Sequence, residues 1–247
     1  MRYPIGVFIS FIGIPDTEII EVMVFGDSIT YGAWDNAGGW VQRLREPIDI
    51  KNLVNPDIAY FVYNLGVIDD TSTGIIKRFE QEMAARRYLN SVQKKIVIFA
   101  VGLNDSELLL KEKKNRVPKE LFKRNVNALI DLGKKYADKT IFIGPTPVDE
   151  PRAVPLPWDK DLGYRNRVVK EYDNIIRLIC KKRNILFLEI FDRIVKLDYV
   201  DLLEDGVHPS PAGHLVIYEL VRDFLEKNKI LDFSLPKRTR TAYRPKK

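Results

Sequence analysis

The sequence predicts an α/β fold built on a doubly wound, mainly parallel sheet. Chain length is the first observation, because 247 residues can bury a sizeable core in one domain without disulfides. The second observation is that short apolar runs alternate with longer amphipathic stretches. The third is that most apolar runs lack strict polar–apolar alternation, which is typical of parallel strands covered on both faces.

Five apolar runs rich in Val, Ile and Phe are the predicted strands, at residues 19–25, 58–65, 96–101, 140–144 and 185–190. Helices are predicted at 72–89, 118–136, 164–182 and 211–227. The clearest is 118–136, where apolar residues recur at helical spacing and Pro118 suits a first turn. This order predicts right-handed crossovers, and ligands of such sheets bind beyond the carboxyl ends of the strands.

We expect a single domain over residues 1–230, with an N-terminal extension at 1–18 and a basic tail at 231–247. The tail holds six Lys and Arg residues against one Asp, so it carries +5 of the net charge of +6 and leaves +1 for the rest. Such an arm can touch nucleic acid or anionic lipid, but a solvated, frayed terminus is the commoner case. We therefore do not expect nucleic acid as a partner.

The N-terminal run at residues 5–14 is apolar and uncharged and follows Arg2, so it loosely resembles a secretory signal. It lacks a small-residue cleavage site, two prolines bracket it, and it is too short to span a bilayer. No transmembrane segment is expected. The single cysteine, Cys180, allows no intrachain disulfide and is compatible with a reducing compartment. We expect a cytoplasmic protein, with secretion through an atypical signal as the alternative.

A serine follows the first predicted strand directly, in Gly26-Asp27-Ser28-Ile29. A serine hydroxyl is inert until a base takes its proton, and the chain has only two histidines. His208 lies three residues after Asp205 in a turn rich in Gly and Pro, where a carboxylate can orient the imidazole. His214 begins the last predicted helix, which favours a packing or capping role for it.

Two further strand ends carry groups that can donate hydrogen bonds to a developing oxyanion. Gly66 ends the second strand and presents a backbone N–H with no side chain in the way, while the Asn104 amide follows the third strand. Each residue alone is more often an ordinary turn residue. Because both residues follow strand ends at the same sheet edge as Ser28, a role in an oxyanion hole is a reasonable hypothesis for them.

These four segments resemble the conserved blocks of the SGNH, or GDSL-type, hydrolases. The blocks lie in order at residues 26–29, 64–66, 102–105 and 205–209, and only Ile29 departs from the usual leucine. The resemblance implies a flavodoxin-like three-layer fold, with Ser28 as nucleophile, His208 as base and Asp205 as the residue that orients His208. It also implies an oxyanion hole made by Ser28 N–H, Gly66 N–H and the Asn104 side chain.

The expected activity is hydrolysis of small-acyl or carbohydrate esters through an acyl-enzyme. A thioesterase or lysophospholipase acting on longer acyl chains, an acyltransferase with the same triad, and a non-catalytic binding module are the alternatives. No cofactor or metal is expected, because the sequence has no cluster of His, Cys and carboxylates at ligand spacing. The sequence leaves the oligomeric state open.

Two connections near the predicted site remain ambiguous. The segment 145–163 contains five prolines and Trp158, and it forms either a stiff surface loop or a wall over the site. Asp69 and Asp70 follow Gly66, and a solvated pair is favoured for them. Four apolar residues near strand ends are candidates for the lining of an acyl pocket: Ile68, Leu108, Val148 and Trp158.

Overall fold

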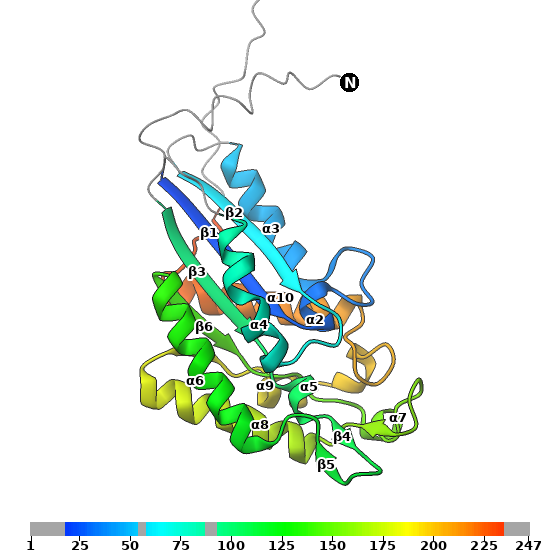
Figure 1. The fold of residues 1–247 in the computed structure, drawn as a ribbon. Coiled ribbons are helices and arrows are strands. Elements are labelled where there is room, and N and C mark those ends of the chain that lie inside the picture. The colour runs from blue at the N-terminus through cyan, green and yellow to red at the C-terminus, as the bar shows by residue number, and fades with distance from the viewer. Residues whose placement is uncertain (1–17, 54–57, 87–92, 235–247) are drawn as a thin grey trace, which may run out of the picture.

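The computed structural model describes residues 18–53, 58–86 and 93–234, so the N-terminal run and the tail beyond residue 234 lie outside it. Its centre is a five-stranded sheet in the order β2-β1-β3-β6-β8 (Figure 1). The strands are β1 (Glu18–Gly26), β2 (Ile58–Gly66), β3 (Gln93–Ala100), β6 (Lys139–Ile143) and β8 (Leu186–Leu188). All neighbouring strands are parallel, which confirms the prediction made from the apolar runs.

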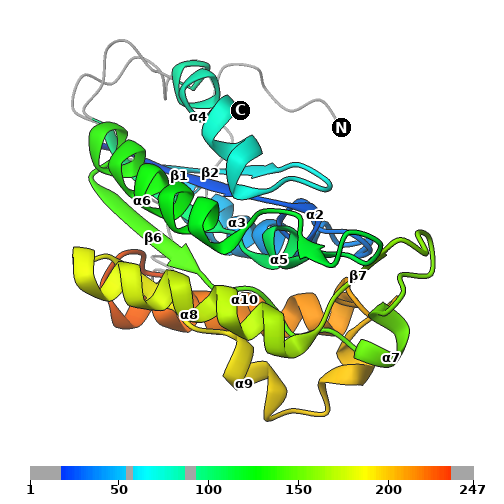
Figure 2. The same ribbon diagram turned by 60° about the horizontal axis from the view of Figure 1, so that its bottom comes forward.

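Helices cover both faces of this sheet and give three layers (Figure 2). One face packs against α3 (Gly39–Asn52), α9 (Phe191–Val195) and α10 (Pro211–Lys227). The other packs against α4 (Ser72–Ala84), α6 (Lys119–Tyr136) and α8 (Asn166–Arg183).

The residues of β1 explain why the sequence shows no alternation there. Val22 and Val24 belong to the core cluster under α3 and α10, whereas Met23 and Phe25 belong to the cluster under α4, α6 and α8. All four side chains are fully buried. Because successive side chains of a strand point to opposite faces, a strand covered on both sides must be apolar at every position.

Shorter elements follow the carboxyl ends of the strands. They include α2 (Ser28–Tyr31), α5 (Leu103–Ser106), α7 (Glu150–Ala153) and a 3₁₀ helix at Tyr199–Leu202. A small antiparallel sheet, β5-β4-β7, joins β4 (Leu108–Leu109) to β5 (Lys114–Asn115) and β7 (Leu162–Gly163). This sheet ties the end of the 145–163 connection to the loop that follows β3.

Helix α3 was not predicted, and its sequence shows why. It begins at Gly38 and Gly39, both with positive φ, it has no side-chain cap, and it contains Pro47. Each of these features weakens a helix signal, yet Trp40, Leu44 and other apolar residues are buried against the sheet. Tertiary packing therefore stabilises this helix. Across the described ranges, no helix combines the length and apolarity needed to cross a membrane.

Candidate active site

Three residues distant in the chain meet at the carboxyl edge of the sheet. Ser28 Oγ lies 3.0 Å from His208 Nε2, although 180 positions separate the two residues. His208 Nδ1 lies 2.7 Å from Asp205 Oδ2. This arrangement allows the imidazole to take the serine proton at one nitrogen while the other nitrogen donates to the carboxylate.

The turn after β1 presents Ser28 to this contact. The Asp27 side chain accepts a hydrogen bond of 3.0 Å from Ile29 N–H and caps α2. A Cβ at Gly26 would lie 2.8 Å from the Ala100 carbonyl oxygen and closer still to Thr30, so only glycine fits between the turn and β3. The Asp27 carboxyl is buried, and burial raises its pKa to about 6.

Asp205 is held in its charged form by its surroundings. Its Oδ1 accepts hydrogen bonds from the N–H groups of Val207, at 3.0 Å, and His208, at 2.8 Å. Partial burial raises the pKa of this carboxyl, but the hydrogen bonds from His208 and Val207 outweigh burial and leave the pKa well below its usual value. A carboxylate fixed in this way can stabilise an imidazolium.

The structure brings Asn104 to the same site. Asn104 lies in α5, its Nδ2 donates a hydrogen bond of 2.9 Å to the Asp70 carbonyl oxygen, and its side chain lines the cavity that holds Ser28. His214 is apart from the site. It is fully buried, and its Nε2 lies 2.9 Å from the Ala33 carbonyl oxygen, in agreement with the predicted packing role.

Gly66 is not brought to the cavity wall. Its N–H donates to Asn64 Oδ1 at 2.9 Å, and the residues of its loop that line the cavity are Ile68 and Asp69. Asp69 has a φ of 66°, a left-handed conformation that Asp adopts more readily than most residues. Within the described ranges, the backbone N–H of Asp69 has no hydrogen-bond partner. The structure therefore favours Asp69 over Gly66 as the source of a backbone donor.

The expectation of a solvated pair is wrong for Asp70, whereas the Asp69 side chain is 65% exposed. Asp70 Oδ2 lies 2.8 Å from Arg78 Nε, and this carboxylate is largely buried. Asp69 pairs with Arg116, whose Nη2 lies 2.7 Å from Asp69 Oδ2. Both carboxylates are thus used to fix the loop between β2 and α4.

The cavity that holds Ser28 and His208 has a volume of about 400 Å³. The 145–163 connection forms part of its wall through Trp158 and Leu162, which agrees with the second of the two predicted roles. Ile68 also lines it, whereas Leu108 and Val148 do not, and Val148 is fully buried.

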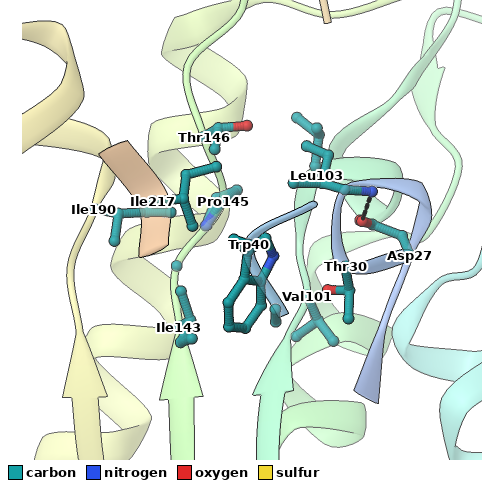
Figure 3. Close-up of a pocket in the computed structure, with 13 residues that line it drawn as sticks. Asp27, Thr30, Trp40, Val101, Leu103, Ile143, Pro145, Thr146, Ile190 and Ile217 are labelled. Atoms are coloured by element: carbon teal, nitrogen blue, oxygen red, sulfur yellow. Dashed lines mark hydrogen bonds between the residues drawn. The ribbon is translucent and has the colours of Figure 1, made fainter. Parts of the chain in front are cut away.

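A second cavity, of about 30 Å³, lies behind the nucleophile turn (Figure 3). Its wall is mostly apolar, with Trp40, Leu103 and Ile217 among the lining residues, and Thr30 and Thr146 contribute hydroxyl groups. This volume can hold about one or two water molecules, so the cavity is too small for a substrate.

Several polar residues of the larger cavity were not predicted from the sequence. Trp34 donates from Nε1 to Asp205 Oδ2 at 2.9 Å, and the Trp34 and Trp158 rings lie 5.6 and 5.8 Å from the His208 ring. Tyr164 lies with its hydroxyl 2.8 Å from Asn104 Oδ1 and 3.0 Å from Glu107 Oε1. Trp34 follows Ser28 by six residues, and this closeness in sequence is a signal that could have identified it. The described residues contain no group of three or more His, Cys, Asp or Glu side chains placed to hold a metal ion.

Known proteins share this architecture. Residues 24–216 match the GDSL-like lipase/acylhydrolase family. Human isoamyl acetate-hydrolyzing esterase 1 homolog is 24% identical over 221 residues, which cover 84% of this chain and 82% of that protein. The acetylxylan esterase of Geobacillus stearothermophilus is 24% identical over 226 residues, which cover 84% of this chain and 93% of that protein.

Solved structures agree on the fold. The crystal structure of Axe2, an acetylxylan esterase from Geobacillus stearothermophilus, aligns with a TM-score of 0.63 at 20% identity, over 91% of this chain and all of that one. A lipase/acylhydrolase from Enterococcus faecalis aligns with a TM-score of 0.60 at 21% identity, over 84% and 96%. These alignments confirm the predicted fold class. Because the family match covers most of the described residues, the chain belongs to the GDSL-like lipase/acylhydrolase family and is a carboxylic-ester hydrolase.

Proposed function

We propose that this esterase uses Ser28 as a nucleophile, His208 as a general base and acid, and Asp205 to orient His208. The observation that carries the proposal is the continuous contact from Ser28 Oγ to His208 at 3.0 Å and from His208 to Asp205 at 2.7 Å, at the wall of an open cavity. These distances are within the range of working hydrogen bonds between a nucleophile, a base and its orienting group.

The reaction proceeds in two acyl-transfer steps. Ser28 Oγ forms a bond to the ester carbonyl carbon as His208 takes the hydroxyl proton, and the carbonyl oxygen becomes an oxyanion. The bond from carbon to the leaving alcohol then breaks, and His208 returns the proton to that alcohol. Water repeats the sequence on the acyl-enzyme and releases the acid and Ser28.

The oxyanion needs donors on the side away from His208. We assign this role to Ser28 N–H and to the free N–H of the Asn104 amide, as the family resemblance implies. Gly66 N–H was the predicted third donor, but it donates to Asn64, so Asp69 N–H is the better candidate.

The substrates we propose are short-chain esters, acetates above all, of small neutral alcohols or carbohydrates. Four acidic residues line the cavity, namely Asp69, Glu107, Asp159 and Asp205. Among the described residues that line it, none is Lys or Arg. Such a wall disfavours the phosphates of lysophospholipids and coenzyme A thioesters. Two similar curated esterases are named for acetyl esters, which supports the same choice.

A nucleophile variant tests the mechanism. Ser28→Ala removes only the Oγ, so turnover of a 4-nitrophenyl acetate should fall on the order of 10⁴-fold or more, with the urea unfolding midpoint little changed. A fluorophosphonate probe should label the wild type at Ser28 and leave the variant unlabelled. Ser234→Ala is the control, because that serine is exposed outside the cavity. Undiminished turnover by S28A refutes the mechanism.

A further inference from the structure

The orientation of the Asn104 amide decides whether it can serve an oxyanion. One N–H of Nδ2 is used at 2.9 Å by the Asp70 carbonyl oxygen, which leaves the second for the cavity. A rotation of the amide by 180° would exchange its oxygen and nitrogen. The side-chain oxygen would then face both the Asp70 carbonyl and the developing oxyanion, and both contacts would be repulsive.

Tyr164 is the group that opposes this rotation. Its hydroxyl lies 2.8 Å from Asn104 Oδ1, on the side of the amide opposite the Asp70 contact. Burial raises the pKa of Tyr164 well above its usual value, so the phenol retains the proton that it donates. A donor at Oδ1 together with an acceptor at Nδ2 is satisfied by only one of the two amide orientations.

Tyr164 is itself held in place. It is 3% exposed, and its backbone N–H donates to the Ala153 carbonyl oxygen at 2.9 Å. The phenol oxygen also lies 3.0 Å from Glu107 Oε1, and Glu107 Oε2 lies 3.3 Å from Arg116 Nη1. Burial raises the pKa of Glu107, against the charge of Arg116. The shorter contact of the phenol oxygen is the one to Asn104 Oδ1, at 2.8 Å, which favours donation of its single proton to the amide.

We infer that Tyr164, supported by Glu107, is a positioning residue that fixes the Asn104 amide with its free N–H toward the oxyanion. This inference rests on the proposed function, because it assigns Tyr164 no role apart from Asn104. Tyr164 follows β7 immediately and lies two residues before α8, so the 145–163 connection delivers it to the site. The connection therefore contributes to catalysis as well as to the cavity wall.

A double-mutant cycle tests this role. Tyr164→Phe removes one hydroxyl, so kcat should fall about five- to tenfold with KM changed less than about twofold. Asn104→Ala should lower kcat on the order of 10²–10³-fold. The Y164F/N104A double variant should have the same kcat as N104A, because Tyr164 acts through the Asn104 amide.

Tyr172→Phe is the matched control. Tyr172 is also fully buried and donates its hydroxyl to a backbone carbonyl, that of Val117, but it does not line the cavity. Y172F should lower stability and leave kcat unchanged. If Y164F proves unfolded, Glu107→Ala replaces it in the same cycle, with the same expected pattern and a smaller loss.

The inference is overturned if the tyrosine change lowers kcat by the same factor in the N104A background as in the wild type, or if Y172F lowers kcat equally. That outcome leaves the proposed function intact. Failure of the proposed function gives a different result. A wild-type protein that is never labelled by fluorophosphonate would refute the role of Ser28 as nucleophile, and it would provide no kcat values for the double-mutant cycle.

Discussion

The hydrogen bond from Trp34 to Asp205 predicts a shift in the pH dependence of the reaction. Asp205 Oδ2 accepts from His208 Nδ1 at 2.7 Å and from Trp34 Nε1 at 2.9 Å. A carboxylate oxygen that is shared between two donors attracts the imidazolium proton less strongly. Trp34→Phe keeps an aromatic ring and removes one donor, so Asp205 stabilises the protonated form of His208 that arises in the reaction more strongly.

The magnitude follows from the exposure of the bond. A hydrogen bond to a charged group contributes about 1.5–3 kcal/mol of free energy. Only part of this free energy changes the stability of the protonated His208 ring relative to the neutral ring. Trp34 is 58% exposed, so water replaces much of the lost donor and the lower end applies. A differential effect of about 0.7 kcal/mol corresponds to about half a pH unit.

The assay is the pH profile of kcat/KM for an aryl acetate, which reports ionisations of the free enzyme. The position of the acid limb does not depend on how the side chain at position 34 contacts the substrate. The midpoint of the acid limb should move up by about half a unit in W34F. Trp158→Phe is the control, because the Trp158 ring lies 5.8 Å from the His208 ring and makes no hydrogen bond to Asp205 among the described contacts. An unmoved acid limb in W34F, or an equal shift in W158F, refutes the reasoning.

Three further predictions concern stability, acyl-chain length and the charge of the alcohol. Burial raises the pKa of Asp27 to about 6 from 3.8, so the stability that this carboxyl contributes is present below about pH 4 and is lost as the pH rises through 6. Asp27→Asn should equal the wild type in urea unfolding at pH 4 and exceed it by up to about 3 kcal/mol at pH 8, and equal stability at pH 8 contradicts this. In a panel of 4-nitrophenyl esters from acetyl to decanoyl, kcat/KM should fall steeply beyond butyryl. Acetates of anionic alcohols should react more slowly than neutral isosteres, and a preference for decanoyl or anionic esters would contradict the proposed substrate class.

Much of the site was predictable because its parts follow strand ends. The apolar run that becomes β1 predicts where Ser28 emerges, and the scarcity of histidines together with the Asp205–His208 spacing predicts a base. Residue type and position along the chain are read directly from the sequence, so these parts of the site are predictable from it. The catalytic roles of these residues and of Asn104 stay proposals that the variants above test.

Contacts made by side chains from distant loops were not predictable in the same way. The sequence placed Gly66 at a strand end, but it could not show that Asn64 accepts the Gly66 N–H or that Asp69 turns toward the cavity in a left-handed conformation. Nor could it show that Tyr164 meets Asn104, which lies 60 positions away.

The sequence by itself determined the parallel sheet, the strand-end placement of the chemistry and the family, because burial on both faces leaves a continuous apolar signature and the motifs are short. The tertiary structure alone decided which polar residues line the cavity and what holds them. Those choices depend on hydrogen bonds that close only when β7, α5 and the nucleophile turn are packed against one sheet edge, as Trp34, Tyr164 and Asp69 show.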